Sequence, residues 1–205
     1  MIGTRKIQGT LAALVALAAT SCAGPTAVRG GHGTENPNLD KAAMSTGLDK
    51  VDLDYLLKEN LDKLFASKAW ARFRGAKDAP VVAIWPIRND TTEHIENQLN
   101  TLLATVESRL VESGDVKVVS RERQREMAQE VGLQNTNAVY DPATVARLSK
   151  QVGAQYFLTG KVQAVDERAE GERRVQYTLT LQVLEVETSV IEFQNTTART
   201  KAIVR

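Results

Sequence analysis

The chain has 205 residues, of which 42% are hydrophobic and 25% charged, an ordinary composition for a globular protein of one or two domains. Its 26 basic and 25 acidic residues leave a formal net charge of +1. A nearly neutral chain lacks the basic excess that nucleic-acid binding requires, so we expect no nucleic-acid partner.

Residues 1–21 have the pattern of a secretory signal peptide. Arg5 and Lys6 give a positive start, and an apolar run follows from Leu11 to Ala19. These nine residues are too few to span a bilayer, which needs about 20. Removing the segment leaves 24 basic and 25 acidic residues, so the mature chain has a net charge of −1.

Cys22 is the predicted lipid anchor. The run Ala19-Thr20-Ser21-Cys22 resembles the bacterial lipobox, although Ala19 stands where Leu is more common. Cys22 is the only cysteine in the chain and therefore has no disulfide partner within it. Two or three acyl chains would hold the protein stably on a membrane. Because Ala23 follows in place of Asp, the pattern resembles that of lipoproteins sorted to the periplasmic face of the outer membrane. The alternative is an ordinary signal peptide that ends near a cysteine.

Residues 22–47 are predicted to form a flexible tether, since they are rich in glycine and contain Pro25, Pro37 and few apolar side chains. Such a segment spans roughly 90 Å when fully extended. As a coil it spans about 30 Å on average. Residues 48–205 are predicted to form one domain.

The first half of this domain alternates helix and strand. Apolar residues at helical spacing predict helices over 52–73 and 93–112, the second ending at Ser113-Gly114. Val81–Ile87 reads as a strand that is buried on both faces, with Pro86 near its end or on an edge. We expect a turn after it, with Asp90 and Glu93 as a capping box.

The second half begins with a short strand over Lys117–Val119 and a helix over 121–131 closed by Gly132. Asp141-Pro142 opens a further helix as N-cap and first residue, and Gly153 closes it. Three strands are expected next, over Tyr156–Val165, over Arg174–Val186 and from Val190 onward. The charged stretch Asp166–Arg173 is interpreted as a hairpin loop.

These elements predict a single compact α/β domain. Its mixed sheet has about four to five strands, because three consecutive hairpin-linked strands at the C-terminus must pair as an antiparallel meander. The helices are expected to pack on this sheet.

No pattern for catalysis or metal binding is present in the sequence. His94 is the only histidine after residue 47, and it lies at the start of an amphipathic helix, where we expect a surface residue. The chain contains no HExxH, no CxxC and no phosphate-binding glycine-rich loop. We therefore expect no enzyme activity and no cofactor apart from the lipid on Cys22, with an exported hydrolase as a distant alternative.

Two stretches resemble the LpoB family: VVAIWPIRNDTT at 81–92 and VGAQYFLTGKV at 152–162. The resemblance covers about 51–205, and the fold is shared with the N-terminal domain of TolB and with CsgG-like proteins. It implies an outer-membrane lipoprotein that activates a class A penicillin-binding protein, the bifunctional peptidoglycan synthase. This tether is shorter and poorer in proline than is usual in the family.

The implied mechanism is docking on a non-catalytic module of the synthase by a monomeric domain. Physical reasoning offers two groups of docking residues: Arg88, Asn89 and Asp90 after the first strand, and Asp166, Glu167, Arg168, Glu170, Glu172 and Arg173 in the charged loop. Turn and capping roles for the first group, and a solvated hairpin for the second, remain alternatives.

A second function stays open from the sequence. A CsgG-like or flagellar accessory lipoprotein would have the same fold and a structural role in assembly. That hypothesis predicts ring-like oligomers, whereas the activator hypothesis predicts a monomer.

Overall fold

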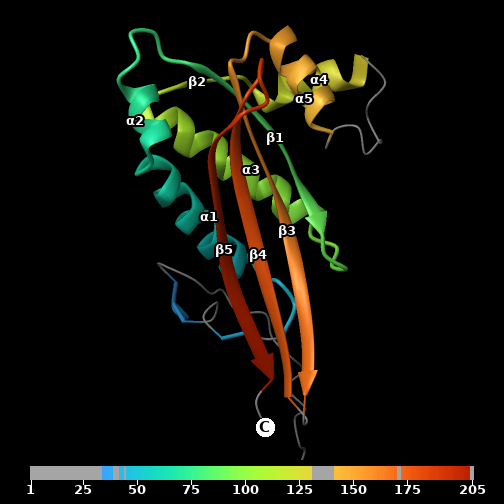
Figure 1. Ribbon diagram of the computed structural model, residues 1–205. Helices are drawn as coiled ribbons and strands as arrows, with labels where there is room; N and C mark the ends of the chain where they lie inside the picture. Colours follow the sequence, from blue (N-terminus) through green and yellow to red (C-terminus); the bar gives the residue numbers. More distant parts are fainter. Residues whose placement is uncertain (1–33, 39–41, 44, 131–140, 170–171, 204–205) are drawn as a thin grey trace, which may run out of the picture. The chain divides into compact units, whose positions relative to one another are not determined.

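The computed structural model describes residues 34–38, 42–43, 45–130, 141–169 and 172–203. Contacts within the chain divide it into two units, Met1–Leu39 and Asp40–Arg205. In the first unit, the Asn36 amide donates a hydrogen bond of 3.3 Å to Thr34 Oγ1. The second unit holds the described helices and the sheet (Figure 1). The predicted signal peptide and Cys22 lie outside the described residues.

The sheet has five strands in the order β2-β1-β3-β4-β5. The pairs β2–β1 and β1–β3 are parallel, whereas β3–β4 and β4–β5 are antiparallel. The strands are β1 (Val81–Asp90), β2 (Lys117–Val118), β3 (Tyr156–Ala169), β4 (Glu172–Glu185) and β5 (Ile191–Ile203). The predicted mixed sheet with a C-terminal meander is therefore confirmed.

The helices are α1 (Lys50–Phe65), α2 (Lys68–Arg74), α3 (Glu96–Ser113), α4 (Arg121–Glu130) and α5 (Pro142–Gln151). In Figure 1, α1 and α3 lie along one face of the sheet, which we call the helix face. The larger apolar core lies there and includes Leu56, Val106 and Leu179. No helix among the described residues is long and apolar enough to cross a membrane.

The opposite side of the sheet, which we call the open face, is covered by described residues near the start of β3. There α5 packs against the sheet in a second, smaller core that includes Leu148 and Phe157. Trp85 donates from Nε1 to Ser149 Oγ over 2.7 Å within this core. Figure 1 shows the long strands β3, β4 and β5 continuing well beyond α4 and α5.

Several predicted ends are confirmed by the backbone. Gly114 ends α3 in the left-handed conformation, with φ 69°. Asp141 caps α5 by accepting from the Thr144 amide over 2.9 Å, and Gly153 follows that helix with φ 75°. The predicted end of α4 at Gly132 lies outside the described residues.

Two predictions for the first half of the domain are wrong. The helix expected over 52–73 is broken into α1 and α2, because Ser67 takes an extended backbone and accepts from the Trp70 amide as a new N-cap. The turn expected directly after Ile87 begins later, since β1 continues to Asp90 and the chain bends over 91–93.

The predicted capping box of Asp90 and Glu93 does not form either. Helix α3 begins at Glu96, and its N-cap Ile95 makes no side-chain capping bond. Glu93 instead uses its carboxylate to accept from the Leu48 amide over 2.8 Å and from the Tyr177 hydroxyl. Its side chain therefore serves a long-range contact.

The loop expected over Asp166–Arg173 is also wrong for most of its length. Residues 166–169 belong to β3 and residues 172–173 to β4, in continuous antiparallel register. Only 170–171 separate the strands, and they lie outside the described residues. Glu167 lies directly opposite Arg174, and Asp166 lies diagonally from Arg173 and offsets the like charges of Arg168 and Arg173. These cross-strand ion pairs allow the stretch to form strand.

Pro86 lies in the interior of β1 and not near its end, but on an edge of the pairing, which is the other placement that the sequence allows. The pairing of β1 with β3 shifts between Ile84 and Ile87, so Pro86 belongs to a bulge. On its other side, β1 has already passed the end of β2, and the buried amide of Gln124 takes over. Its nitrogen donates to Ile84 O over 2.6 Å, and its oxygen accepts from Ile84 N. A proline is tolerated there because no ladder needs its amide.

Gly160 in β3 is required by close contact with β4. A Cβ atom added to Gly160 would lie 2.4 Å from the carbonyl oxygen of Thr180, which is backbone and cannot move aside cheaply. This crowding lies next to the β1 bulge, since Gly160 pairs with Ile87. The position therefore excludes any side chain.

We predict that Gly160→Ala lowers the free energy of unfolding by about 2 kcal/mol, as overpacking of a core does. The control is Gly75→Ala, where the nearest atom, Ala71 O, lies at 3.4 Å and φ is −87°. Denaturant unfolding of both variants measures the difference. Equal stability of the two variants would contradict the crowding argument.

Candidate docking surface

The three residues predicted after the first strand lie at the end of β1 and have separate roles. Arg88 and Asp90 form an ion pair with Nε and Oδ1 2.7 Å apart. Asn89 Oδ1 accepts from the amide and the hydroxyl of Thr91, and Asn89 Nδ2 donates to Glu93 O over 2.7 Å. Asn89 thus shapes the turn before α3, whereas Arg88 and Asp90 remain exposed.

The charges predicted in the hairpin largely neutralise one another. Arg173 forms a two-pronged ion pair with Asp166, at 2.8 Å between Nη2 and Oδ2. Arg168 adds a contact of 3.6 Å to the same carboxylate. Glu167 pairs with Arg174 in the same cross-strand manner, at 2.7 Å. The hydrogen bond from Arg173, against a smaller effect of burial, holds the pKa of Asp166 below its usual range.

The register distributes the predicted residues over both faces of the sheet. Lys161 pairs with Arg88, Gln163 with Asp90, and Thr180 with Lys161, so these side chains share the open face. By the same alternation Glu167 and Glu172 belong to the open face, whereas Asp166, Arg168 and Arg173 belong to the helix face. Glu170 lies outside the described residues. The structure therefore does not join the predicted residues into one surface.

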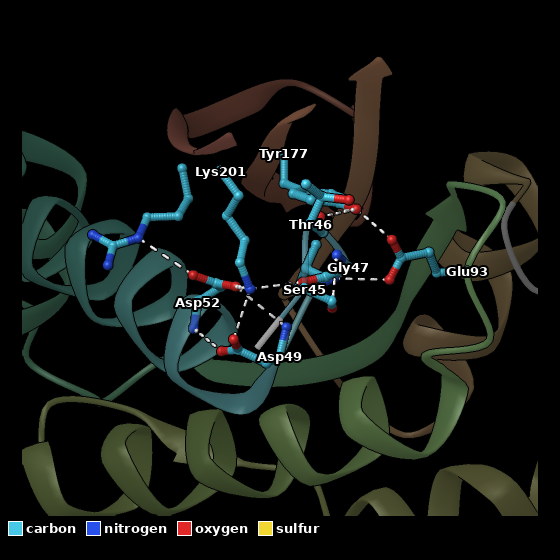
Figure 2. A network of polar contacts seen from close by, with 10 residues as sticks. Ser45, Thr46, Gly47, Asp49, Asp52, Glu93, Tyr177 and Lys201 are labelled. Atoms are coloured by element: carbon cyan, nitrogen blue, oxygen red, sulfur yellow. Dashed lines mark hydrogen bonds and ion pairs between the residues drawn. The ribbon is translucent and has the colours of Figure 1, made fainter. Parts of the chain in front are cut away.

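Residues 45–49, which we call the strap, lie against the helix face beside β4 and β5. Lys201 of β5 is buried and donates from Nζ to Gly47 O, Asp49 Oδ2 and Asp52 Oδ2, all within 2.8 Å (Figure 2). Asp52 is also buried, at the first turn of α1. A buried cation paired with two carboxylates and a carbonyl fixes the start of α1 on the last strand.

A second cluster holds the strap from its other side. The Tyr177 hydroxyl contacts Thr46 O at 3.0 Å and donates to the Glu93 carboxylate (Figure 2). Burial and the neighbouring Glu93 carboxylate both raise the pKa of Tyr177, so the phenol stays protonated. Arg173 donates to Thr46 Oγ1 over 3.0 Å. The sequence assigned residues 45–47 to the tether, and in the structure they contact β4 and β5.

Sequence reasoning missed Lys201, Tyr177 and Lys161. Lys201 lies near the end of β5, where the inward positions after Phe193 carry polar residues such as Asn195, so apolar alternation gave no signal. Tyr177 lies at an inward position of β4, but its hydroxyl partner, Glu93, lies 84 residues away in the sequence, so no local pattern points to the contact. Lys161 directly follows Gly160 in the motif at 152–162, and this position is the sequence feature that could have identified it.

No group of three or more metal-ligating side chains occurs among the described residues. His94 is exposed just before α3, as predicted. In the described part of the chain, the arrangement offers charges and hydrogen-bonding groups for binding a partner.

A family model described as the peptidoglycan-synthase activator LpoB matches residues 52–198. Among solved structures, the LpoB C-terminal domain from Escherichia coli is similar with a TM-score of 0.53 and 18% identity. The same domain from Salmonella enterica gives 0.51 and 19%. Each match covers 72% of this chain and 98% of the other. No curated protein matches the chain.

We predict that Lys201→Met lowers the free energy of unfolding by about 3 kcal/mol, because Asp52 would remain buried without its main cation. Lys58→Met is the control, since its ion pair with Asp62 is exposed and screened by water and therefore contributes little to stability. Denaturant unfolding measures both. Comparable losses in the two variants would contradict the assigned role of the buried cluster.

The same cluster predicts a dependence of stability on pH. Burial raises the pKa of Asp49, but hydrogen bonds from Lys201 and the Asp52 amide outweigh it and lower the pKa below 3.8. The stabilisation that ionised Asp49 provides is therefore fully present above pH 3.8, and it is lost as the pH falls through the lowered pKa of the folded state. We expect the stability difference between the wild type and Lys201→Met to shrink below about pH 4. A difference that stays constant down to pH 2 would contradict this assignment.

Proposed function

Since the chain belongs to the LpoB family of peptidoglycan-synthase activators, we propose that it activates a class A penicillin-binding protein as a lipid-anchored protein of the outer membrane. The family match over residues 52–198 carries the proposal, because it covers nearly the whole α/β domain. The similarity in fold to the LpoB C-terminal domain supports it.

The proposed mechanism is regulatory. The domain docks on a non-catalytic module of the synthase and favours its active conformation. It can shift that equilibrium only by the difference between its affinities for the two conformations. A monomeric domain suffices for this, and no cofactor takes part apart from the lipid on Cys22.

The anchor and the tether set where the domain acts. Lipid on Cys22 would hold the chain at the periplasmic face of the outer membrane. A tether that averages about 30 Å as a coil keeps the domain near that membrane. Full activation of an inner-membrane synthase then requires an extended tether, or a synthase whose regulatory module reaches outward.

The test is the rate of glycan polymerisation by the purified cognate synthase with and without residues 22–205 carrying Cys22→Ala. We expect the soluble protein to bind and to accelerate the reaction, because the lipid serves anchoring only. Absence of both binding and acceleration would overturn the proposal. Ring-like oligomers in sedimentation would favour the assembly-accessory function in its place.

The lipid anchor gives a separate prediction. Cells that express the full chain and are fed a labelled fatty acid should incorporate label into the wild type and lose it in Cys22→Ala, with the variant released in soluble form. Ser21→Ala is the control, since a small residue is kept before the cysteine. Label retained in Cys22→Ala would contradict lipidation at this position.

A further inference from the structure

The open face of β3, β4 and β5 is depleted of charge over most of its length. Alternation places eleven side chains on it between Lys161 and the start of the charged hairpin: Lys161, Gln163, Val165, Gln176, Thr178, Thr180, Gln182, Gln194, Thr196, Ala198 and Thr200. Lys161 alone is charged among them. Loss of charged residues from an otherwise polar surface is typical of the centre of a protein interface.

Pairs of these polar side chains are already ordered by one another. Thr180 and Thr196 lie 2.9 Å apart at their hydroxyls, and Gln182 Nε2 donates to Gln194 Oε1 over 2.5 Å. Side chains held in this way lose little conformational entropy when a partner covers them. These hydrogen bonds therefore preorganise part of the open face.

A hollow of about 280 Å³ lies at the edge of this surface, between α5 and the sheet. Val145, Phe157 and Leu184 contribute its apolar part. Arg88 and Lys161 also line it, together with the polar side chain of Gln182. An apolar floor with two cations suits a side chain that is partly apolar and lies close to a carboxylate.

Of the two cations at this hollow, Lys161 is the one that lacks a carboxylate partner among the described residues. Arg88 forms an ion pair with Asp90, and the side chain of Arg88 is about half exposed. Lys161 forms no ion pair with any described residue, in contrast to the arginines of the hairpin, which face Asp166 and Glu167. Covering Lys161 with a neutral surface would be costly, because a desolvated cation needs a partner of opposite charge.

We infer that the open face around Lys161 is the docking surface for the synthase, and that the synthase contributes an acidic, partly apolar segment that enters the hollow. This inference rests on the proposed function and adds the site and the chemistry of the partner. It places docking on the open face, away from the strap and the neutralised hairpin.

Charge reversal tests the inference. Lys161→Glu should raise the dissociation constant for the synthase by about tenfold or more, because an acidic segment would meet a like charge. Lys77→Glu is the matched control, since Lys77 is an exposed lysine outside the sheet, and its affinity should not change. The protein used is residues 22–205 with Cys22→Ala, and thermal unfolding checks that both variants are folded.

A steric pair of variants tests the face independently of charge. Ala198→Trp puts a bulky group on the exposed part of the open face, whereas Val111→Trp puts one on α3, where Val111 is 59% exposed. We expect Ala198→Trp to weaken binding and Val111→Trp to leave it unchanged. Weakening by Val111→Trp alone would place docking on the helices and overturn the inference.

The two proposals fail differently. If the wild type neither binds nor activates the synthase, the proposed function is wrong. If the wild type activates the synthase and Lys161→Glu activates it equally at every concentration, the function stands and the assigned docking surface is wrong.

Discussion

The contact between Lys201 and Asp52 is the constraint on which the rest of the domain depends. It joins the last strand to the first helix across 149 residues of sequence, and both side chains are buried. Each charge would be strongly unfavourable without the other, so the pair requires that β5 lie beside the start of α1. The strap follows from the same arrangement, because Lys201 also holds Gly47 and Asp49 (Figure 2).

This arrangement leaves the two faces of the sheet with different tasks. The helix face is closed by α1, α3 and the strap, and its polar groups, such as Tyr177 and Glu93, are paired within the domain. Within the described ranges, the open face is covered by α5 near the start of β3, and Lys161 on this face forms no ion pair.

Much of this fold could be predicted from local patterns. The alternation in β4, the glycines after α3 and α5 and the cap at Asp141 are local signals, and the structure confirms them. The break at Ser67 was missed because the apolar pattern continues across it. The hairpin itself was expected, but the extension of β3 and β4 through its charged residues was missed. That extension is stabilised by cross-strand ion pairs such as Asp166 with Arg173, whereas a charged composition by itself indicates a loop. Lys201 could not be predicted, since its partners are distant in sequence.

The proposed docking surface depends on which side chains lie together on one face of the sheet. The register between strands decides this, and local sequence patterns do not reveal that register. The most direct measurement is an amide NMR titration of the soluble mature chain with the synthase. The account predicts shifts at Lys161, Gln163 and Thr178 on the open face, with α1 and α3 unaffected. Shifts confined to α1 and α3, with none on the open face, would contradict it.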